Sequence, residues 1–208
     1  MRTKVNPGRR RLLLALLLAA GLRLAGAPAV AEVLPEAQHR LVEMERIYLE
    51  DHPKLVDQQV RVAELKRLQA TGTNEPRVLV EARVELAVGR RRYLENHPLL
   101  AELASRVNTL EQEWRKNPAA PDILFEARAD LAVVALRYAE QHPRYQDQRR
   151  KLDALEHHLQ GATPATYALN LARAIKEYYA GRYDENHPKM QELAVRIREL
   201  EREQSAAK

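Results

Sequence analysis

Apolar residues recur along this chain at helical spacing, in a pattern that repeats every 45 residues. The first half of each copy carries a leucine column: Leu34, Leu79, Leu124 and Leu169. Three residues later comes an alanine column: Ala37, Ala82, Ala127 and Ala172. The second half carries another leucine column: Leu65, Leu110, Leu155 and Leu200. Apolar steps of three and four residues form one narrow stripe on a helix, so the pattern predicts helices throughout.

A Tyr-x-x-x-His-Pro segment divides each copy in two. It recurs without slippage at Tyr48, His52, Pro53, Tyr93, His97, Pro98, Tyr138, His142, Pro143, Tyr183, His187 and Pro188. A fixed period of this length is typical of repeat architecture, so we interpret these residues as a structural repeat motif.

Each copy therefore predicts a helix, a polar junction and a second helix, over residues of about 33–70, 78–115, 123–160 and 168–205. The segments between copies have the Pro, Gly, Thr and Asn content of turns: 71–76, 117–121 and 161–164. We expect an all-α fold of four tandem 45-residue helical hairpins. They would form either an α-solenoid or an antiparallel coiled-coil bundle.

The junction itself fits two geometries. Proline suits the first turn of a helix and keeps the preceding His out of helical geometry, so the His is predicted to be an N-cap. Asn96 and Asn186 are placed to close the incoming helix in a left-handed conformation. The apolar stripe also keeps its heptad phase through the junction (Leu55, Gln58, Val62), which fits one long helix kinked at proline. The hairpin is favoured because stop and start signals coincide.

The segments Tyr93 to Glu111 and Tyr183 to Glu201 share the string Y-x-E-x-H-P-x-x-x-x-L-x-x-x-V/I-x-x-L-E. This string resembles a coiled-coil segment of bacterial polysaccharide chain-length determinant proteins. The resemblance covers about 19 residues per copy. It implies a location in the cell envelope and a coiled-coil hairpin. It implies no activity, because the family's flanking membrane helices and kinase-like domain have no counterpart in this sequence.

The N-terminal segment predicts export. A basic start leads into the 11-residue apolar run 12–22, and Ala29-Val30-Ala31 fits the small-residue cleavage rule. Spanning a bilayer takes about 20 residues. We therefore expect a signal peptide over 1–31, cut before Glu32, and a helical repeat domain over 32–208 without a transmembrane anchor. The product would be periplasmic or secreted, through either the general or the twin-arginine route.

The charge of the chain changes once this segment is set aside. The whole sequence has 34 Lys+Arg and 29 Asp+Glu, a formal net charge of +5. Residues 1–31 hold six bases and no acid, so the remainder has 34 − 6 = 28 bases against 29 acids, or −1. A nucleic-acid partner is therefore not expected. The absence of cysteine from the sequence excludes disulfides and thiolate metal sites.

Candidate chemistry is sparse. One metal ion cannot collect histidines that stand 45 residues apart on stacked units. The neighbours His157 and His158 point about 100° apart on a helix, which predicts surface positions. The sequence contains no glycine-rich phosphate loop, nucleophile elbow or H-E-x-x-H motif. We therefore expect no enzyme activity, no catalytic residue, no metal and no cofactor.

The best candidate for a contact surface is aromatic and basic. Tyr178, Tyr179 and Tyr183 form the densest aromatic cluster, and the arginines before the tyrosine column either pair with acids or contact an anionic partner: Arg92, Arg137 and Arg182. We predict an exported, non-catalytic scaffold or adaptor for protein–protein interaction in the bacterial cell envelope, linked to polysaccharide assembly or export. Its partners would be an envelope protein, a second copy or a polysaccharide. The alternative is a periplasmic ligand-handling protein: a small helical chaperone, or a binder of metal or glycan.

Overall fold

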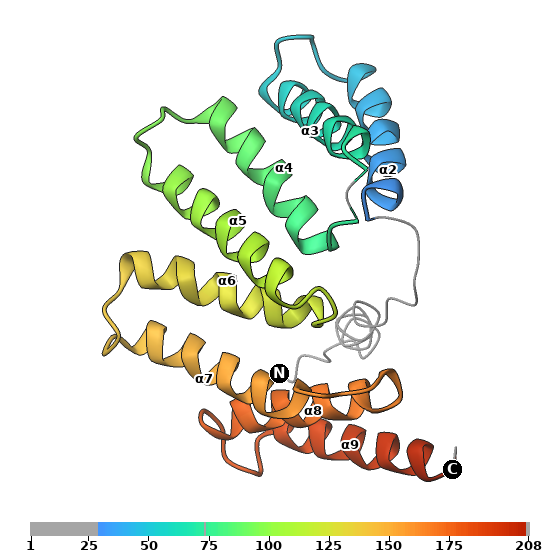
Figure 1. Ribbon diagram of the computed structural model, residues 1–208, viewed down its shortest axis with the longest axis vertical. Helices are drawn as coiled ribbons and strands as arrows, with labels where there is room; N and C mark the ends of the chain where they lie inside the picture. The colour runs from blue at the N-terminus through green and yellow to red at the C-terminus, as the bar shows by residue number, and fades with distance from the viewer. Residues whose placement is uncertain (1–28, 73, 207–208) are drawn as a thin grey trace, which may run out of the picture. The chain divides into compact units, whose positions relative to one another are not determined.

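The computed structural model describes residues 29–72 and 74–206. Within these residues the regular elements are eight α-helices (Figure 1): α2 (Ala29–Glu45), α3 (Pro53–Ala70), α4 (Arg77–Arg92), α5 (Pro98–Lys116), α6 (Asp122–Arg137), α7 (Pro143–Leu159), α8 (Pro164–Ala180) and α9 (Pro188–Ala206). The prediction of an all-α fold is confirmed. The predicted helix pairs and the turns between them match these bounds to within four residues.

The His-Pro junctions reverse the chain. Helix α2 packs against α3, α4 against α5, and α8 against α9. Each of these pairs joins the two helices on either side of one His-Pro dipeptide, which makes a hairpin. The alternative of one long helix kinked at proline is therefore wrong for these copies.

The described residues divide into two compact units, 29–148 and 149–206, and α7 begins in the first and ends in the second. In the first unit each helix from α2 to α6 packs on the next, and α2 also contacts α4, as α4 contacts α6. Contacts that link each helix to its next neighbours in the chain are typical of an α-solenoid. In the second unit α8 and α9 pack together.

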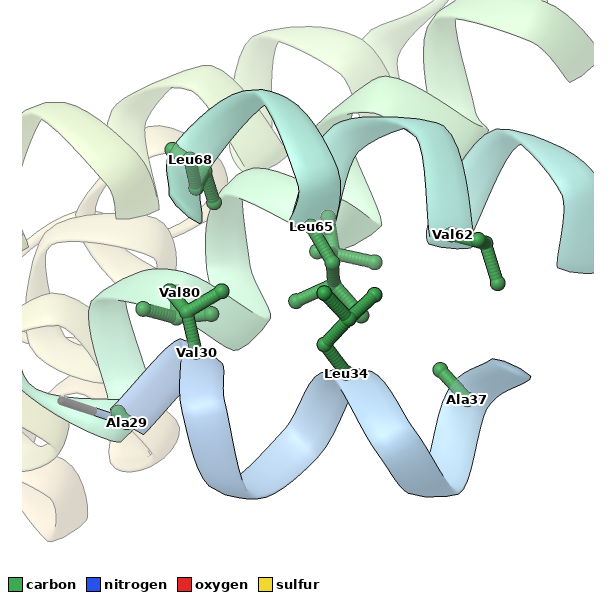
Figure 2. Close-up of a cluster of buried hydrophobic side chains, with 9 residues drawn as sticks. Ala29, Val30, Leu34, Ala37, Val62, Leu65, Leu68 and Val80 are labelled. Carbon is green, nitrogen blue, oxygen red and sulfur yellow. The ribbon is translucent and has the colours of Figure 1, made fainter. Parts of the chain in front are cut away.

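The columns read from the sequence form the core. All members of both leucine columns and of the alanine column are buried. Figure 2 shows one such cluster, in which Val30 and Leu34 of α2 lie close to Leu65 and Leu68 of α3 and to Val80 of α4. The stripe also includes one polar side chain, Gln58, whose buried amide donates a 2.7 Å hydrogen bond to a backbone carbonyl of α2. That bond offsets the cost of burying the amide.

Helix α2 extends further toward the N-terminus than its pattern predicts. It includes Ala29, about one turn before residue 33, and Pro35 lies inside it. Ala29 and Val30 are buried in the cluster of Figure 2. A cut before Glu32 would remove both side chains from that cluster. The signal-peptide prediction otherwise falls on residues 1–28, outside the described part, and stays a prediction.

None of the helices in residues 29–72 and 74–206 combines the length and apolar character that a bilayer-spanning segment needs.

Candidate functional site: the four Tyr-His turns

Each His-Pro turn is closed by the same backbone hydrogen bond. The N–H of the histidine donates to the carbonyl three residues earlier, at 3.0 Å in the first turn, 2.9 Å in the second and third, and 3.1 Å in the fourth. Helices α4 and α6 end at the motif tyrosine, which adopts extended geometry at Tyr93 and Tyr138. An extended residue followed by a tight turn therefore reverses the chain.

This geometry leaves no role for a left-handed asparagine. Among residues 29–72 and 74–206, positive φ values occur only at Gly72 and Gly161. The prediction that Asn96 and Asn186 adopt a left-handed cap is therefore wrong. The tight turn already brings the chain back without a positive φ. In the fourth turn the backbone N–H of Asn186 instead donates to the Asp184 carboxylate at 2.9 Å.

The motif histidines cap the helices that follow them. His52 and His97 have extended backbones. In all four copies the ring Nδ1 accepts a hydrogen bond from the backbone N–H two residues later, at 3.3 Å in the first copy, 3.2 Å in the second, 3.1 Å in the third and 3.2 Å in the fourth. The acceptor satisfies an N–H that the first helical turn leaves without a partner. The ring proton must therefore sit on Nε2.

Each histidine ring also stacks on the tyrosine four residues before it. The ring centroids lie 4.2, 4.3, 4.2 and 3.9 Å apart from the first to the fourth copy, and the planes are within 26° of parallel. The tyrosines are half-buried in all four copies. The stack joins the end of one helix to the start of the next, which gives the recurring Tyr-x-x-x-His-Pro string a structural purpose.

We predict that His97→Ala lowers the free energy of unfolding by about 2 kcal/mol. Loss of the cap acceptor costs about 1 kcal/mol, and loss of a ring pair costs about 0.5–1.5 kcal/mol. His97→Asn, which keeps a cap acceptor, should recover about half of the loss. Urea unfolding followed by Trp114 fluorescence, on the adjoining helix α5, measures this. His39→Ala is the matched control, because that side chain is 77% exposed on α2. Equal stability of His97→Ala and wild type would contradict the capping role.

Two of the three arginines that precede the motif tyrosines pair with acids within the fold. Arg92 on α4 makes two hydrogen bonds to the Asp57 carboxylate on α3, one of them 3.0 Å from Nε to Oδ1. Arg137 on α6 binds Glu102 on α5 in the same manner, with Nη2 2.6 Å from Oε2. The hydrogen bond from Arg92 holds the pKa of Asp57 below its ordinary value. These arginines therefore join successive hairpins, and of the two alternatives the structure shows pairing with acids.

Three tyrosines of the fourth copy, Tyr178, Tyr179 and Tyr183, form one cluster in the fold. The ring centroids of Tyr178 and Tyr179 are 5.3 Å apart, and those of Tyr179 and Tyr183 are 5.6 Å apart. The Lys189 ammonium lies 5.2 Å from the Tyr179 ring centre, and the Arg182 guanidinium lies 4.9 Å from that of Tyr178. Such distances are typical of cation–π contacts. The cluster is thus a half-buried aromatic surface with two cations over it.

Exposed leucines mark the first two turns. Leu49 and Leu94 occupy equivalent positions after the motif tyrosine, and each is 80% exposed. Ile47, beside the first of them, is 73% exposed. The equivalent residues in the third and fourth copies are Ala139 and Asp184. Leucine therefore serves no packing purpose at this position in the described fold.

A groove of about 460 Å³ runs along α2, α3 and α4. Its walls carry five bases and four acids: Arg40, Lys54, Arg61, Arg77, Arg92, Glu36, Asp57, Glu81 and Glu85. Alternating signs give no strong field of one sign, so the groove does not favour a highly charged ligand of either sign.

Two clusters of titratable side chains were not predicted from the sequence. Arg83 on α4 places Nη2 2.9 Å from both Glu75 Oε1 and Glu111 Oε1, in a largely buried triad. Burial raises the pKa of Glu75, and the charge of Arg83 only partly opposes that effect. The second group joins His157, His158 and Glu177. One feature of the sequence could have indicated this second cluster. Glu177 stands where the other copies have an apolar residue: Val42, Ala87 and Ala132.

No protein-family model, curated protein or solved structure matches this chain. The resemblance to chain-length determinant proteins therefore stays a prediction.

Proposed function

We propose that this protein is a non-catalytic helical-repeat scaffold that presents its row of Tyr-His turns to a partner protein in the cell envelope. The observation that carries the proposal is the repeated turn. Within residues 29–148 the turns before α3, α5 and α7 follow one edge of the stack (Figure 1), since each hairpin returns the chain to the same side.

The turns offer contact chemistry that the fold itself does not use. Leu49 and Leu94 are 80% exposed beside rigid Tyr-His stacks, at equivalent positions in successive copies. Single exposed apolar residues are common on protein surfaces. Here, however, the same exposed leucine recurs one repeat later, and regular spacing suits a partner that is extended or itself repetitive.

The location and the lack of catalysis rest on the sequence. The basic and apolar N-terminal segment supports export, and the resemblance to chain-length determinant proteins supports a role beside polysaccharide assembly. Several of the charged side chains that could serve as acid, base or anion-binding groups are engaged in ion pairs between helices. This supports a structural use of the charges.

Site-specific photo-crosslinking in native cells tests the proposal. We expect a photoreactive phenylalanine analogue at position 49 or 94 of the full chain to give the same discrete adduct. The same analogue at Gln112, an exposed position near the other end of α5, should not give it. Equal labelling from Gln112, or different adducts from positions 49 and 94, would contradict a shared contact edge.

Leu94→Asp supplies a matched loss-of-contact variant. It introduces the residue that the fourth copy carries at this position, so the hairpin should fold unchanged. The adduct from position 49 should weaken in this variant if one partner spans both turns.

A further inference from the structure

The second unit brings together two histidines and a glutamate that lie on different helices. His157 and His158 occupy the last turn of α7, and Glu177 occupies the last turn of α8. His157 Nδ1 lies 3.2 Å from Glu177 Oε2, and His158 Nε2 lies 2.7 Å from the same oxygen. One potential ligand atom from each residue lies within 4.8 Å of the other two.

Neighbouring helical residues diverge, yet these two rings converge on one oxygen. His157 uses Nδ1, the nitrogen nearer its backbone, and His158 uses Nε2, the nitrogen farther away. The different reach compensates for the angle of about 100° between the two side chains. The ring centroids are 4.6 Å apart. The prediction that these histidines merely point apart on the surface overlooked this choice of ring nitrogen.

The three atoms lie close enough for small side-chain movements to bring them around one metal ion. Zinc binds imidazole nitrogen and carboxylate oxygen at about 2.0–2.2 Å, so two ligands of a tetrahedral ion lie about 3.3 Å apart. The His157 distance of 3.2 Å is near that value, whereas the His158 distance of 2.7 Å is a hydrogen-bond length that must open by about 0.6 Å when both atoms bind one ion. The two nitrogens can approach through a small rotation of the His157 ring, because that side chain is 70% exposed. His158 is only 22% exposed and gives the site a fixed wall.

The charge of the carboxylate suits a divalent cation. Both rings converge on Glu177 Oε2, and the Glu177 side chain is 49% exposed. An imidazole nitrogen that binds a metal carries no proton, so in the bound state the proton of each ring would sit on its other nitrogen.

The other described histidines are placed differently. The four motif histidines use Nδ1 to cap helices, and His39 faces a single carboxylate, Glu43, at 3.8 Å. In the described part of the chain (29–72 and 74–206), one group of three or more His, Asp or Glu side chains has ligand atoms within 4.8 Å of one another. That group is His157, His158 and Glu177. Two imidazoles and one carboxylate suit zinc and similar transition metals rather than calcium or magnesium.

We propose that His157, His158 and Glu177 bind one Zn²⁺ ion, which ties the end of α7 to α8 and leaves a coordination position open for water or a partner's side chain. The proposal is independent of the scaffold function. It predicts that Zn²⁺ stabilises the folded chain, because the metal binds a geometry that the unfolded chain lacks.

The test is titration calorimetry of the tag-free full chain with ZnCl₂ at pH 7.5. We expect one equivalent of Zn²⁺ to bind. Glu177→Ala and His157→Gln should each weaken binding by about tenfold or more, since even loss of an outer-shell partner costs 10–100-fold. Each variant introduces the residue that the preceding copy has at the equivalent position: Ala132 for Glu177→Ala and Gln112 for His157→Gln. The fold should therefore be retained. His39→Gln is the control and should bind as the wild type does.

A second measurement separates coordination from surface adsorption. Co²⁺ in place of Zn²⁺ should give visible absorption with the wild type and His39→Gln, and lose it with Glu177→Ala. Absence of Zn²⁺ binding by the wild type would overturn the proposal. Unchanged affinity in Glu177→Ala, or an equal loss in His39→Gln, would overturn it as well.

Discussion

Phe125→Ala is expected to lower the free energy of unfolding of the α2–α6 stack by about 3–5 kcal/mol. Phe125 is the single phenylalanine of the chain and is 1% exposed on α6. It belongs to one cluster with Leu79 of α4 and Leu110 of α5, so three helices lose contacts together. The cost combines lost transfer free energy with the cavity that the rigid neighbours cannot fill.

Urea unfolding measures this change, with Trp114 fluorescence and far-UV circular dichroism as two probes of one transition. Phe125→Val should cost less, because Val80 fills the equivalent position in the preceding copy and is also buried. Leu94→Asp on the exposed turn should change stability by less than about 0.5 kcal/mol. A loss below about 1 kcal/mol in Phe125→Ala would contradict a core that spans three helices.

The second large effect is expected at Arg83. Arg83→Gln should destabilise the protein by about 3–5 kcal/mol, as removal of one partner from a buried ion pair typically does. The Glu75 side chain is 4% exposed and that of Glu111 is 23% exposed. Without the guanidinium, the buried Glu75 carboxylate loses its 2.9 Å ion pair, while Glu111 keeps the exposed Arg115 at 3.5 Å. Glutamine stands at the equivalent position of the first copy, Gln38, so the helix itself tolerates the residue.

Arg173→Gln is the matched control. Arg173 occupies the same position two copies later and binds Glu201 at 2.8 Å, with the two side chains 43% and 45% exposed. Water screens that pair, so its loss should cost at most about 1 kcal/mol. Similar losses from Arg83→Gln and Arg173→Gln in urea unfolding would show that burial of the triad carries no extra weight.

The effect of Arg83→Gln should depend on pH. Burial raises the pKa of Glu75 above its ordinary value, so the folded state holds that proton up to a higher pH than the unfolded chain does. The stability contributed by such a carboxyl is present at low pH and is lost as pH rises through the folded pKa. Arg83 opposes that loss. The difference between wild type and Arg83→Gln should therefore be larger at pH 7 than at pH 5, and no dependence on pH would contradict this account.

Much of the fold follows from local properties of the chain. The leucine and alanine columns predict both the helices and their buried faces, because a helix returns to the same side about every 3.6 residues. The His-Pro dipeptides predict where helices begin, since proline and the residue before it restrict their own backbones. The conformation of the turn was predicted wrongly at Asn96 and Asn186, where a tight turn serves without a left-handed residue.

The repeated period, the helices, their buried stripes and the capping histidines were thus determined by the sequence itself, through interactions between residues at most a few positions apart. The tertiary structure alone decided which charges meet. Arg92 reaches Asp57, Arg83 lies between Glu75 and Glu111, and two histidines converge on Glu177. Each of these contacts depends on the register between neighbouring helices and on the direction of long side chains. The Arg92–Asp57 pair does recur one period later as Arg137–Glu102. A solvated helix face accepts almost any arrangement of charge, so such a recurrence alone does not show which acid each arginine meets.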